Sequence, residues 1–369
     1  MPAPLTYLTM DSVKGGVGAS QVLPYVERLA AGGRPVELHS FEQDDVTGDL
    51  GAGIRWHPHR FGRGGQAAGA VRVAVGAAAL RGVGLVHARS DLAAASALIG
   101  RPAAWVWDVR SFWVDQRISL GMVRSGSVVE RTLRSIEGQA ARRSTAIITL
   151  TQAAIDELAR RYGAGIASKA HVVTTCVDLQ RFGPSPWPDR SLSVLLSGSY
   201  NALYDLPSML GVVEALRRHR PTALTLLRPD PTPWDADVLA AGGRVGASSF
   251  AAMPGHVAGH HVGLSVCRAA DPRALMAAMP TKIGEFLASG RPVVVNAGLG
   301  DCDALLPAAG AGVVMAGTDG VAVDRAAAQL LDLVDDPATP ERCRRLAEDH
   351  FSLEGAVATL QGIYRRIEA

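Results

Sequence analysis

Residues 280–295 read PTKIGEFLASGRPVVV, and this stretch decides the fold that the chain is expected to adopt. A proline and a threonine open it and Gly290 follows its helical part, which is how short helices commonly begin and end. The valines at 293–295 follow at once and predict a buried parallel strand. Lys282 and Glu285 stand three residues apart and therefore share one face of the predicted helix.

The start of this helix is suited to an anion. Backbone N–H groups of a first helical turn point outward, and the helix dipole adds partial positive charge there. Thr281 and Lys282 lie at that point, and Lys282 brings a full charge. Glu285, one turn later, can accept hydrogen bonds from sugar hydroxyls. These are the groups needed to hold a nucleotide sugar by its diphosphate and its ribose.

The segment resembles the donor-binding signature of retaining glycosyltransferases of family 4 (glycosyl transferases group 1), many of which carry a similar Pro-Thr-Lys-x-x-Glu pattern followed by Gly-x-Pro-Val-Val. The resemblance extends from the first strand to the final helix. It implies the GT-B fold, an α/β architecture of two Rossmann-like domains whose parallel sheets face a central cleft.

Composition narrows the class of protein. The 369 residues suggest two domains, and 48% hydrophobic residues can form substantial cores. A net charge of only +2 argues against nucleic acid as a partner. Four cysteines without metal-ligand spacing indicate small core residues of a reduced compartment: Cys176, Cys267, Cys302 and Cys343.

The chain shows no signal peptide and no stretch of about 18 apolar residues that would predict a membrane span. We therefore expect a cytoplasmic protein. Peripheral contact with the inner face of the membrane is expected if the acceptor is a lipid.

Strand and helix patterns alternate along the whole chain, which predicts parallel sheets covered by helices. The prolines at 184, 186 and 188 indicate a linker. The predicted parts are an acceptor-binding domain (1–183), the linker (184–192), a nucleotide-sugar-binding domain (193–350) and a helix that, by the resemblance, crosses back to the first domain (351–369). Acceptor choice is expected to lie in loops 44–53 and 113–127.

A glycine-rich loop follows the first predicted strand. Gly15, Gly16 and Gly18 let backbone N–H groups approach phosphate oxygens without a Cβ in the way. The spacing matches neither the dinucleotide fingerprint nor the P-loop. The loop resembles the first loop of family 4 enzymes, which implies contact with the donor diphosphate or the transferred sugar. A tight turn without a ligand is the alternative.

The residues 108–115, DVRSFWVD, follow a buried strand, where polar side chains of open α/β sheets reach the ligand crevice. They resemble an Asp-x-Arg-Gly-Phe-Trp-x-Asp-Glu motif of family 4, with Ser111 and Gln116 as departures. By the resemblance, Asp108 and Arg110 face the acceptor, and Arg110 orients it or neutralises the leaving phosphate. An ion pair that merely holds the loop is the alternative.

The preceding strand ends in a similar way. His87 and Arg89 are expected to line the acceptor side of the site, although a structural role for His87 is the alternative.

In the second half, Gly198 and Ser199 follow a strand and resemble a family loop that faces the donor nucleotide. Tyr200 or Tyr204 would lie near the base, or simply be exposed. Arg228, at the end of a later strand, would face the diphosphate.

One departure from the family bears on the donor. Many family 4 enzymes carry two glutamates eight positions apart, and the second corresponds to Glu285. The first would fall at position 277, which is Ala277 in this chain. Two Asp-x-Asp pairs begin at Asp235 and Asp301, and we interpret them as helix-capping residues. Neither these pairs nor the adjacent histidines at 260 and 261 predict a metal site, and no cofactor is expected beyond the nucleotide sugar as co-substrate.

The expected reaction is sugar transfer with retention of configuration. Lys282, Arg228 and Arg110 are the predicted catalytic residues, since they would stabilise the departing diphosphate. Glu285 would hold the ribose, and no protein nucleophile is required. Two alternatives remain: a degenerate sugar-nucleotide-binding or scaffold protein, which Ala277 favours, and a sugar-nucleotide epimerase, which lacks its expected carboxylate and histidine set.

Overall fold

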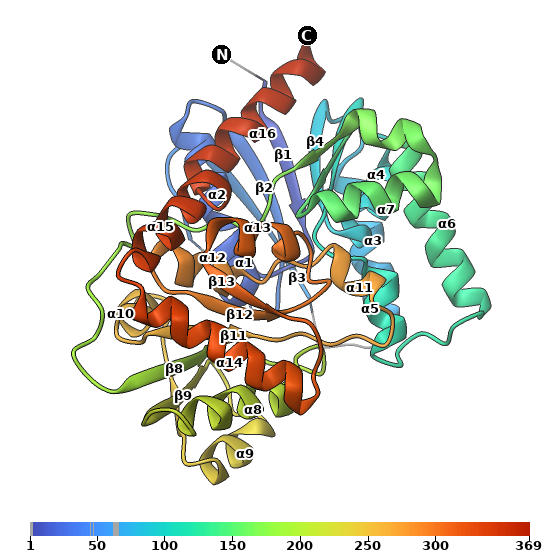
Figure 1. Ribbon diagram of the computed structural model, residues 1–369. Helices are drawn as coiled ribbons and strands as arrows, with labels where there is room; N and C mark the ends of the chain where they lie inside the picture. The colour runs from blue at the N-terminus through green and yellow to red at the C-terminus, as the bar shows by residue number, and fades with distance from the viewer. Residues whose placement is uncertain (1–2, 45, 47, 62–65) are drawn as a thin grey trace. The chain divides into compact units, whose positions relative to one another are not determined.

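The computed structural model describes residues 3–44, 46, 48–61 and 66–369. The chain divides into two compact units, Met1–Thr174 with Leu353–Ala369, and Thr175–Ser352. Each unit contains one parallel sheet with its helices (Figure 1), so the predicted α/β class with two Rossmann-like units is confirmed. Residues 45 and 47 of the predicted acceptor loop lie outside the described residues.

The first unit has a seven-stranded sheet in the order β3-β2-β1-β4-β5-β6-β7. Its strands are β1 (Leu5–Thr9), β2 (Val36–Glu42), β3 (Ile54–Arg60), β4 (Leu85–Arg89), β5 (Ala104–Val109), β6 (Ala146–Thr149) and β7 (Ala170–Val172). Its helices are α1 (Gly16–Gln21), α2 (Leu23–Ala31), α3 (Gln66–Ala79), α4 (Asp91–Gly100), α5 (Trp113–Ser119), α6 (Val128–Arg143), α7 (Gln152–Tyr162), the 3-10 helix η1 (Ala164–Lys169) and α16 (Leu353–Glu368).

The second unit has a six-stranded sheet in the order β10-β9-β8-β11-β12-β13. Its strands are β8 (Leu192–Ser197), β9 (Thr222–Arg228), β10 (Arg244–Ala247), β11 (Val262–Ser265), β12 (Val293–Asn296) and β13 (Gly312–Met315). Its helices are α8 (Leu206–Arg217), α9 (Trp234–Ala240), α10 (Met253–Ala258), α11 (Arg273–Met276), α12 (Thr281–Ala288), α13 (Cys302–Ala309), α14 (Gly320–Asp335) and α15 (Thr339–His350).

The helix and the strand predicted from residues 280–295 are both present, as α12 and β12. Strands β8, β11 and β12 are buried at every position, as parallel strands covered on both faces must be. Their side chains join those of α8 and α14 in one apolar core. The sheet therefore offers only its strand ends and following loops for binding.

The C-terminal helix α16 belongs to the first unit and packs against α2 (Figure 1). Arg34 donates two hydrogen bonds to the carboxylate of Glu368, at 2.7 and 2.8 Å, which secures the last turn of α16.

The chain passes from the first unit to the second after residue 174 and returns after residue 352. The sequence instead predicts these boundaries at residues 183 and 350. The proline-rich segment 184–192 lies within the second unit. Arg291, which is fully buried, donates to the backbone oxygens of Ser185 and Pro186 at 3.1 and 2.7 Å and packs its guanidinium on the ring of Trp187. These contacts hold the segment on its own unit.

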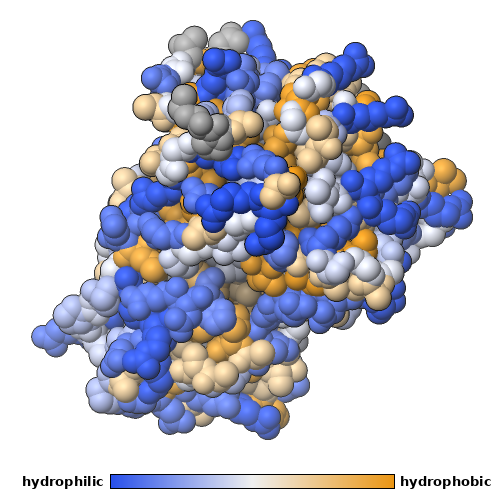
Figure 2. All heavy atoms as spheres, turned by 90° about the horizontal axis from the view of Figure 1, so that it is seen from above, coloured by the Kyte–Doolittle hydropathy of each residue, from blue (hydrophilic) through white to orange (hydrophobic). Residues whose placement is uncertain are grey.

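Within the described residues, no helix is long and apolar enough to cross a membrane. Figure 2 shows mostly hydrophilic residues on the face in view, with hydrophobic residues in smaller groups among them.

Packing of α12 on the second sheet gives a first test. A methyl group added at Gly263 would lie 2.4 Å from ring carbons of the buried Phe286. We expect Gly263→Ala to lower the free energy of unfolding by about 1–3 kcal/mol, measured by urea denaturation, because the ring has to move in a close-packed core. Gly255→Ala is the control, since its added methyl meets nothing within 4 Å. Equal stability of the two variants would contradict the packing argument.

Candidate functional site

Helix α12 is held on two sides by aromatic rings. Phe286 lies against Gly263 of β11, and a side chain at Gly284 would come within 3.0 Å of the Phe351 ring. The helix begins at Thr281, after Pro280, without a side-chain cap. Because the helix cannot rotate between these contacts, the direction of Lys282 and Glu285 is determined by packing.

The ammonium group of Lys282 lies between two tyrosine rings. Its Nζ is 3.9 Å from the ring centroid of Tyr200 and 4.2 Å from that of Tyr204. The side chain is only 8% exposed, and Nζ has no hydrogen-bond partner among the described residues. Two cation–π contacts stabilise the charge in part, but they use none of its three N–H donors.

The loop after β8 approaches this ammonium closely. Gly198 has a φ of +100°, a conformation that favours glycine, and a Cβ added there would lie 3.7 Å from Nζ of Lys282. The exposed Ser199 follows it. The structure thus brings together four of the predicted donor-binding residues in the second unit: Gly198, Ser199, Lys282 and Glu285.

Burial shifts the pKa values of the charged pair on α12 toward each other. It lowers the pKa of Lys282 to about 8, and the nearby Cys267 and Glu285 oppose this shift. It raises the pKa of Glu285 to about 7, against the influence of Lys282 and Arg181. Groups shifted in this way are common at functional sites, and a bound anion would favour the ammonium.

The identity of the cation also matters. Of the 37 lysines and arginines in the chain, only Lys14, Lys169 and Lys282 are lysines, and all the others are arginines. A compact ammonium fits between Tyr200 and Tyr204, whereas a planar guanidinium is larger and needs a different set of partners.

Arg228, the third predicted cation, already has a partner. It ends β9, and its Nε lies 2.8 and 2.9 Å from the two carboxylate oxygens of Asp235. This hydrogen bond lowers the pKa of Asp235 to about 2. A role of Arg228 toward phosphate stays a prediction. The two Asp-x-Asp pairs lie at the starts of α9 and α13, but the N-cap residue of neither helix forms a side-chain cap hydrogen bond, so the predicted capping is not observed.

The predicted aromatic neighbours of the base form a cluster of their own. The rings of Tyr200 and Tyr204 lie 4.8 Å apart, edge to face, and Trp234 lies 4.9 Å from Tyr200. Sequence reasoning missed Trp234, which lies in α9, remote in the chain. No local pattern indicates this contact.

In the first unit, the glycine loop opens helix α1. Gly15 and Gly16 have open space around them, whereas a Cβ at Gly18 would collide with the backbone oxygen of Ser12. Gly18 is therefore required by packing, and Gly15 and Gly16 leave room for a ligand.

Glu42, at the end of β2, anchors this loop and was missed by sequence reasoning. Its carboxylate accepts hydrogen bonds from the Ser12 hydroxyl, from the Val13 N–H at 3.0 Å and from the Ser40 hydroxyl at 2.6 Å. The signal that could have revealed it is a polar residue at the carboxyl end of a strand.

His87, Asp108 and Arg110 form a buried network. The His87 Nε2 lies 3.0 Å from Asp108, its Nδ1 lies 2.7 Å from the hydroxyl of Tyr364, and its ring stacks on Tyr7. Arg110 donates to Asp108 at 2.9 Å. Burial would raise the pKa of Asp108, but Arg110 and His87 outweigh it and lower it to about 2. His87 and Asp108 are fully buried, so their contact with an acceptor stays a prediction.

Arg89 is nearly buried as well. It donates to Asp11 at 2.6 Å, just before the glycine loop. Like Glu42, it supports that loop, and its predicted contact with the acceptor is untested by this geometry.

Comparison with known proteins identifies the fold. No family model matches the sequence, and no curated protein matches it. Solved structures match it over nearly its full length. Sucrose-phosphate synthase from Thermosynechococcus elongatus is 16% identical, with a TM-score of 0.73 over 99% of both chains. HepE of Anabaena, in complex with UDP and glucose, is 13% identical, with a TM-score of 0.69 over 98% of this chain and 99% of that one.

WaaG, a glycosyltransferase involved in lipopolysaccharide biosynthesis, is 15% identical, with a TM-score of 0.70 over 97% of this chain and 100% of that one. These are GT-B structures, so the predicted GT-B fold is confirmed. At such low identity the likeness shows the fold alone.

The buried ammonium of Lys282 predicts how the free energy of unfolding changes with pH. Because the pKa of Lys282 is lower in the folded protein than its ordinary value of 10.5, its cost to stability is full below pH 8 and disappears as pH rises toward 10.5. We expect wild type to gain roughly 1–3 kcal/mol relative to Lys282→Met between pH 7 and pH 10, measured by urea unfolding. Lys14→Met, the same change at an exposed lysine, is the control. A difference that is independent of pH would contradict burial of the charge.

Proposed function

We propose that the protein is a retaining glycosyltransferase of the family 4 type, which moves a sugar from a nucleotide-diphosphate sugar to a glycan, a lipid-linked molecule or a small molecule. One observation carries the proposal: the buried ammonium of Lys282 lacks a hydrogen-bond partner among the described residues, at the start of a helix in a GT-B chain. An unpartnered buried charge costs stability, and a ligand anion would compensate that cost.

In the proposed donor complex, Lys282 and the first turn of α12, from Thr281 onward, bind the diphosphate. Glu285 accepts hydrogen bonds from the ribose hydroxyls, which suits a carboxylate one turn along the same helix. Gly198 and Ser199 contact the nucleotide side of the donor. Arg228 adds charge near the diphosphate.

The first unit is proposed to contribute its own substrate contacts. Gly15 and Gly16 have the space for a phosphate or sugar, and Gly18 shapes the turn that presents them. Arg110 orients the acceptor. Because His87 and Asp108 are buried behind Arg110, we assign them a positioning role, together with the Arg89 that holds Asp11.

The reaction breaks the bond between the anomeric carbon and the phosphate oxygen, and its electron pair leaves with the diphosphate. The acceptor hydroxyl attacks the same face of the sugar, and its proton passes to the leaving phosphate oxygen. In this proposal Lys282 stabilises the negative charge that develops on the leaving diphosphate, which is the main catalytic contribution expected of the protein. The proposal assigns no metal and no protein nucleophile to this transfer.

Because the proposed donor is a nucleotide sugar, we also propose a cytoplasmic location, with peripheral contact at the inner membrane face for a lipid-linked acceptor. The solved Anabaena structure holds UDP and glucose, which makes UDP the first nucleotide to test.

A catalytically degenerate binding protein is the second candidate. Ala277, where many relatives carry a glutamate, is fully buried at the end of α11 and has no side-chain group to offer a sugar, so only backbone groups of the loop 274–279 could contact it. This observation favours donor binding without transfer.

The donor site is tested by thermal unfolding of the full chain with UDP, GDP, dTDP and ADP. We expect one of them, UDP first, to raise the melting temperature by several degrees, because a ligand that binds only the folded state stabilises it. The double variant Lys282→Ala, Glu285→Ala should lose the shift. Arg345→Ala with Glu341→Ala is the matched control, since it removes an exposed ion pair one turn apart on α15 of the same unit.

Absence of any shift with all four nucleotides, in a folded protein, would overturn the donor site.

Transfer itself is tested with the sugar form of the nucleotide that binds. We expect nucleotide release that depends on an acceptor, retention of the anomeric configuration by NMR, and a loss of at least about 100-fold in kcat/KM for Lys282→Ala. Binding without release or transfer would instead support the degenerate protein.

A further inference from the structure

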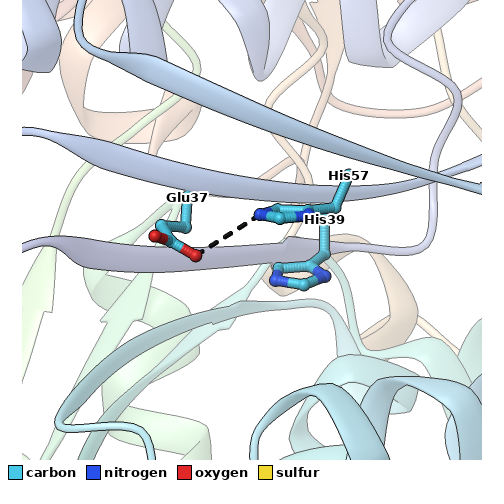
Figure 3. A group of neighbouring side chains, drawn as sticks. All are labelled: Glu37, His39 and His57. Carbon is cyan, nitrogen blue, oxygen red and sulfur yellow. Dashed lines mark ion pairs between the residues drawn. The ribbon is translucent and has the colours of Figure 1, made fainter.

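Four potential metal ligands lie together at one edge of the first sheet. Glu37 and His39 come from β2, and His57 and His59 from β3, the edge strand. The parallel register sets His39 opposite His57. Because side chains alternate along a strand, these odd-numbered residues point to the same face of the sheet. Figure 3 shows three of them converging.

Three of these residues have nitrogen and oxygen atoms close enough to share one ion, and His59 lies next to His39. The Nε2 of His57 lies 3.3 Å from Oε2 of Glu37, the dashed line in Figure 3. The Nδ1 of His39 lies 3.0 Å from Nε2 of His59. Ligand atoms of Glu37, His39 and His57 all lie within 4.8 Å of one another. Zinc bonds of about 2.0–2.1 Å in a tetrahedron separate the ligands by about 3.3 Å, so small side-chain rotations suffice.

The chemistry of the three rings also suits a metal. The ring of His39 stacks on that of His57 with centroids 4.5 Å apart, and its other neighbour is His59. Burial and the neighbouring rings lower the pKa of His39 to about 4 and also lower the pKa of His59. Neutral imidazoles keep the lone pairs that bind metals.

A ring nitrogen of His57 supports a metal ion independently. Its Nε2 is shielded from solvent and forms no hydrogen bond within the described residues, although a carboxylate oxygen lies 3.3 Å away. The ring nitrogen of His57 and the carboxylate oxygen of Glu37 face the same space without a hydrogen bond between them, and a cation could bind both.

We propose that Glu37, His39, His57 and His59 form a binding site for a divalent transition-metal ion, Zn²⁺ in the first place. Imidazole with one carboxylate is a donor set for zinc and its neighbours, whereas Mg²⁺ and Ca²⁺ prefer oxygen ligands alone. The ion would link the edge strand β3 to β2 and so stabilise the first unit. The site uses no residue of the proposed transferase chemistry.

Arg55 is the group that opposes this ion. It donates to the other carboxylate oxygen of Glu37 at 3.0 Å, but its side chain is 73% exposed and can turn into solvent. Glu37 can therefore give one oxygen to the metal and keep the other for Arg55. Removal of Arg55 should leave zinc affinity unchanged or make it higher.

The experiment uses the full chain after treatment with a chelator. Zn²⁺ is titrated in competition with a chromophoric chelator, and thermal unfolding is followed with and without the metal. We expect one equivalent to bind, with a rise in melting temperature. His39→Ala with His57→Ala should weaken binding by roughly 100-fold or more, since even an outer-shell partner can matter that much.

His219→Ala with His350→Ala is the matched control, because it removes two exposed histidines outside the cluster. His39→Gln with His57→Gln keeps more of the side-chain volume and replaces the alanine pair if that pair does not fold. Equal zinc affinity of wild type and the cluster variant, or failure of wild type to bind zinc, overturns the proposal. The nucleotide-induced shift of the cluster variant is measured in parallel, so failure of the metal site is distinguishable from failure of the donor site.

Discussion

The Phe286 ring occupies the space that a side chain at position 263 would need, and this packing constraint orients α12 on the second sheet. On another side, Gly284 lets the ring of Phe351 approach the same helix. A helix fixed by two aromatic rings in a close-packed core cannot turn to bring a buried charge back to water. The position of Lys282 between Tyr200 and Tyr204 therefore follows from apolar packing, which compensates the unfavourable burial of the ammonium.

That burial also changes the pKa values of the two charged residues on the helix. Lys282 and Glu285 each have a pKa moved toward neutrality, because both have lost solvent and neither fully compensates the other. A site built in this way is poor for stability in the absence of a ligand. In the donor complex that we propose, little reorganisation of the site would be needed when the diphosphate binds.

The first unit shows the contrast between satisfied and unsatisfied polar groups. His87 has partners at both ring nitrogens, in Asp108 and Tyr364, and it ties the C-terminal helix to the first sheet. The histidines of β2 and β3 instead crowd against one another and against Glu37, with Nε2 of His57 lacking a hydrogen bond within the described chain. The first arrangement holds the fold together, while the second suggests a ligand.

Local sequence determined much of the secondary structure of this protein. The alternation of strands and helices, the helix and strand of residues 280–295, and the common face of Lys282 and Glu285 depend on periodicity and on end signals that span a few residues. These features could be predicted because neighbours in the chain produce them.

The contacts between distant parts of the chain were decided only by the tertiary structure. The tyrosine rings around Lys282, the burial of His87 under Tyr364, the anchoring of the glycine loop by Glu42 and the meeting of His39 with His57 all join residues far apart in the chain. Strand register and helix packing bring such residues together, and both result from the summed burial of many side chains. No short stretch of sequence contains that sum, so these contacts become visible only in the folded chain.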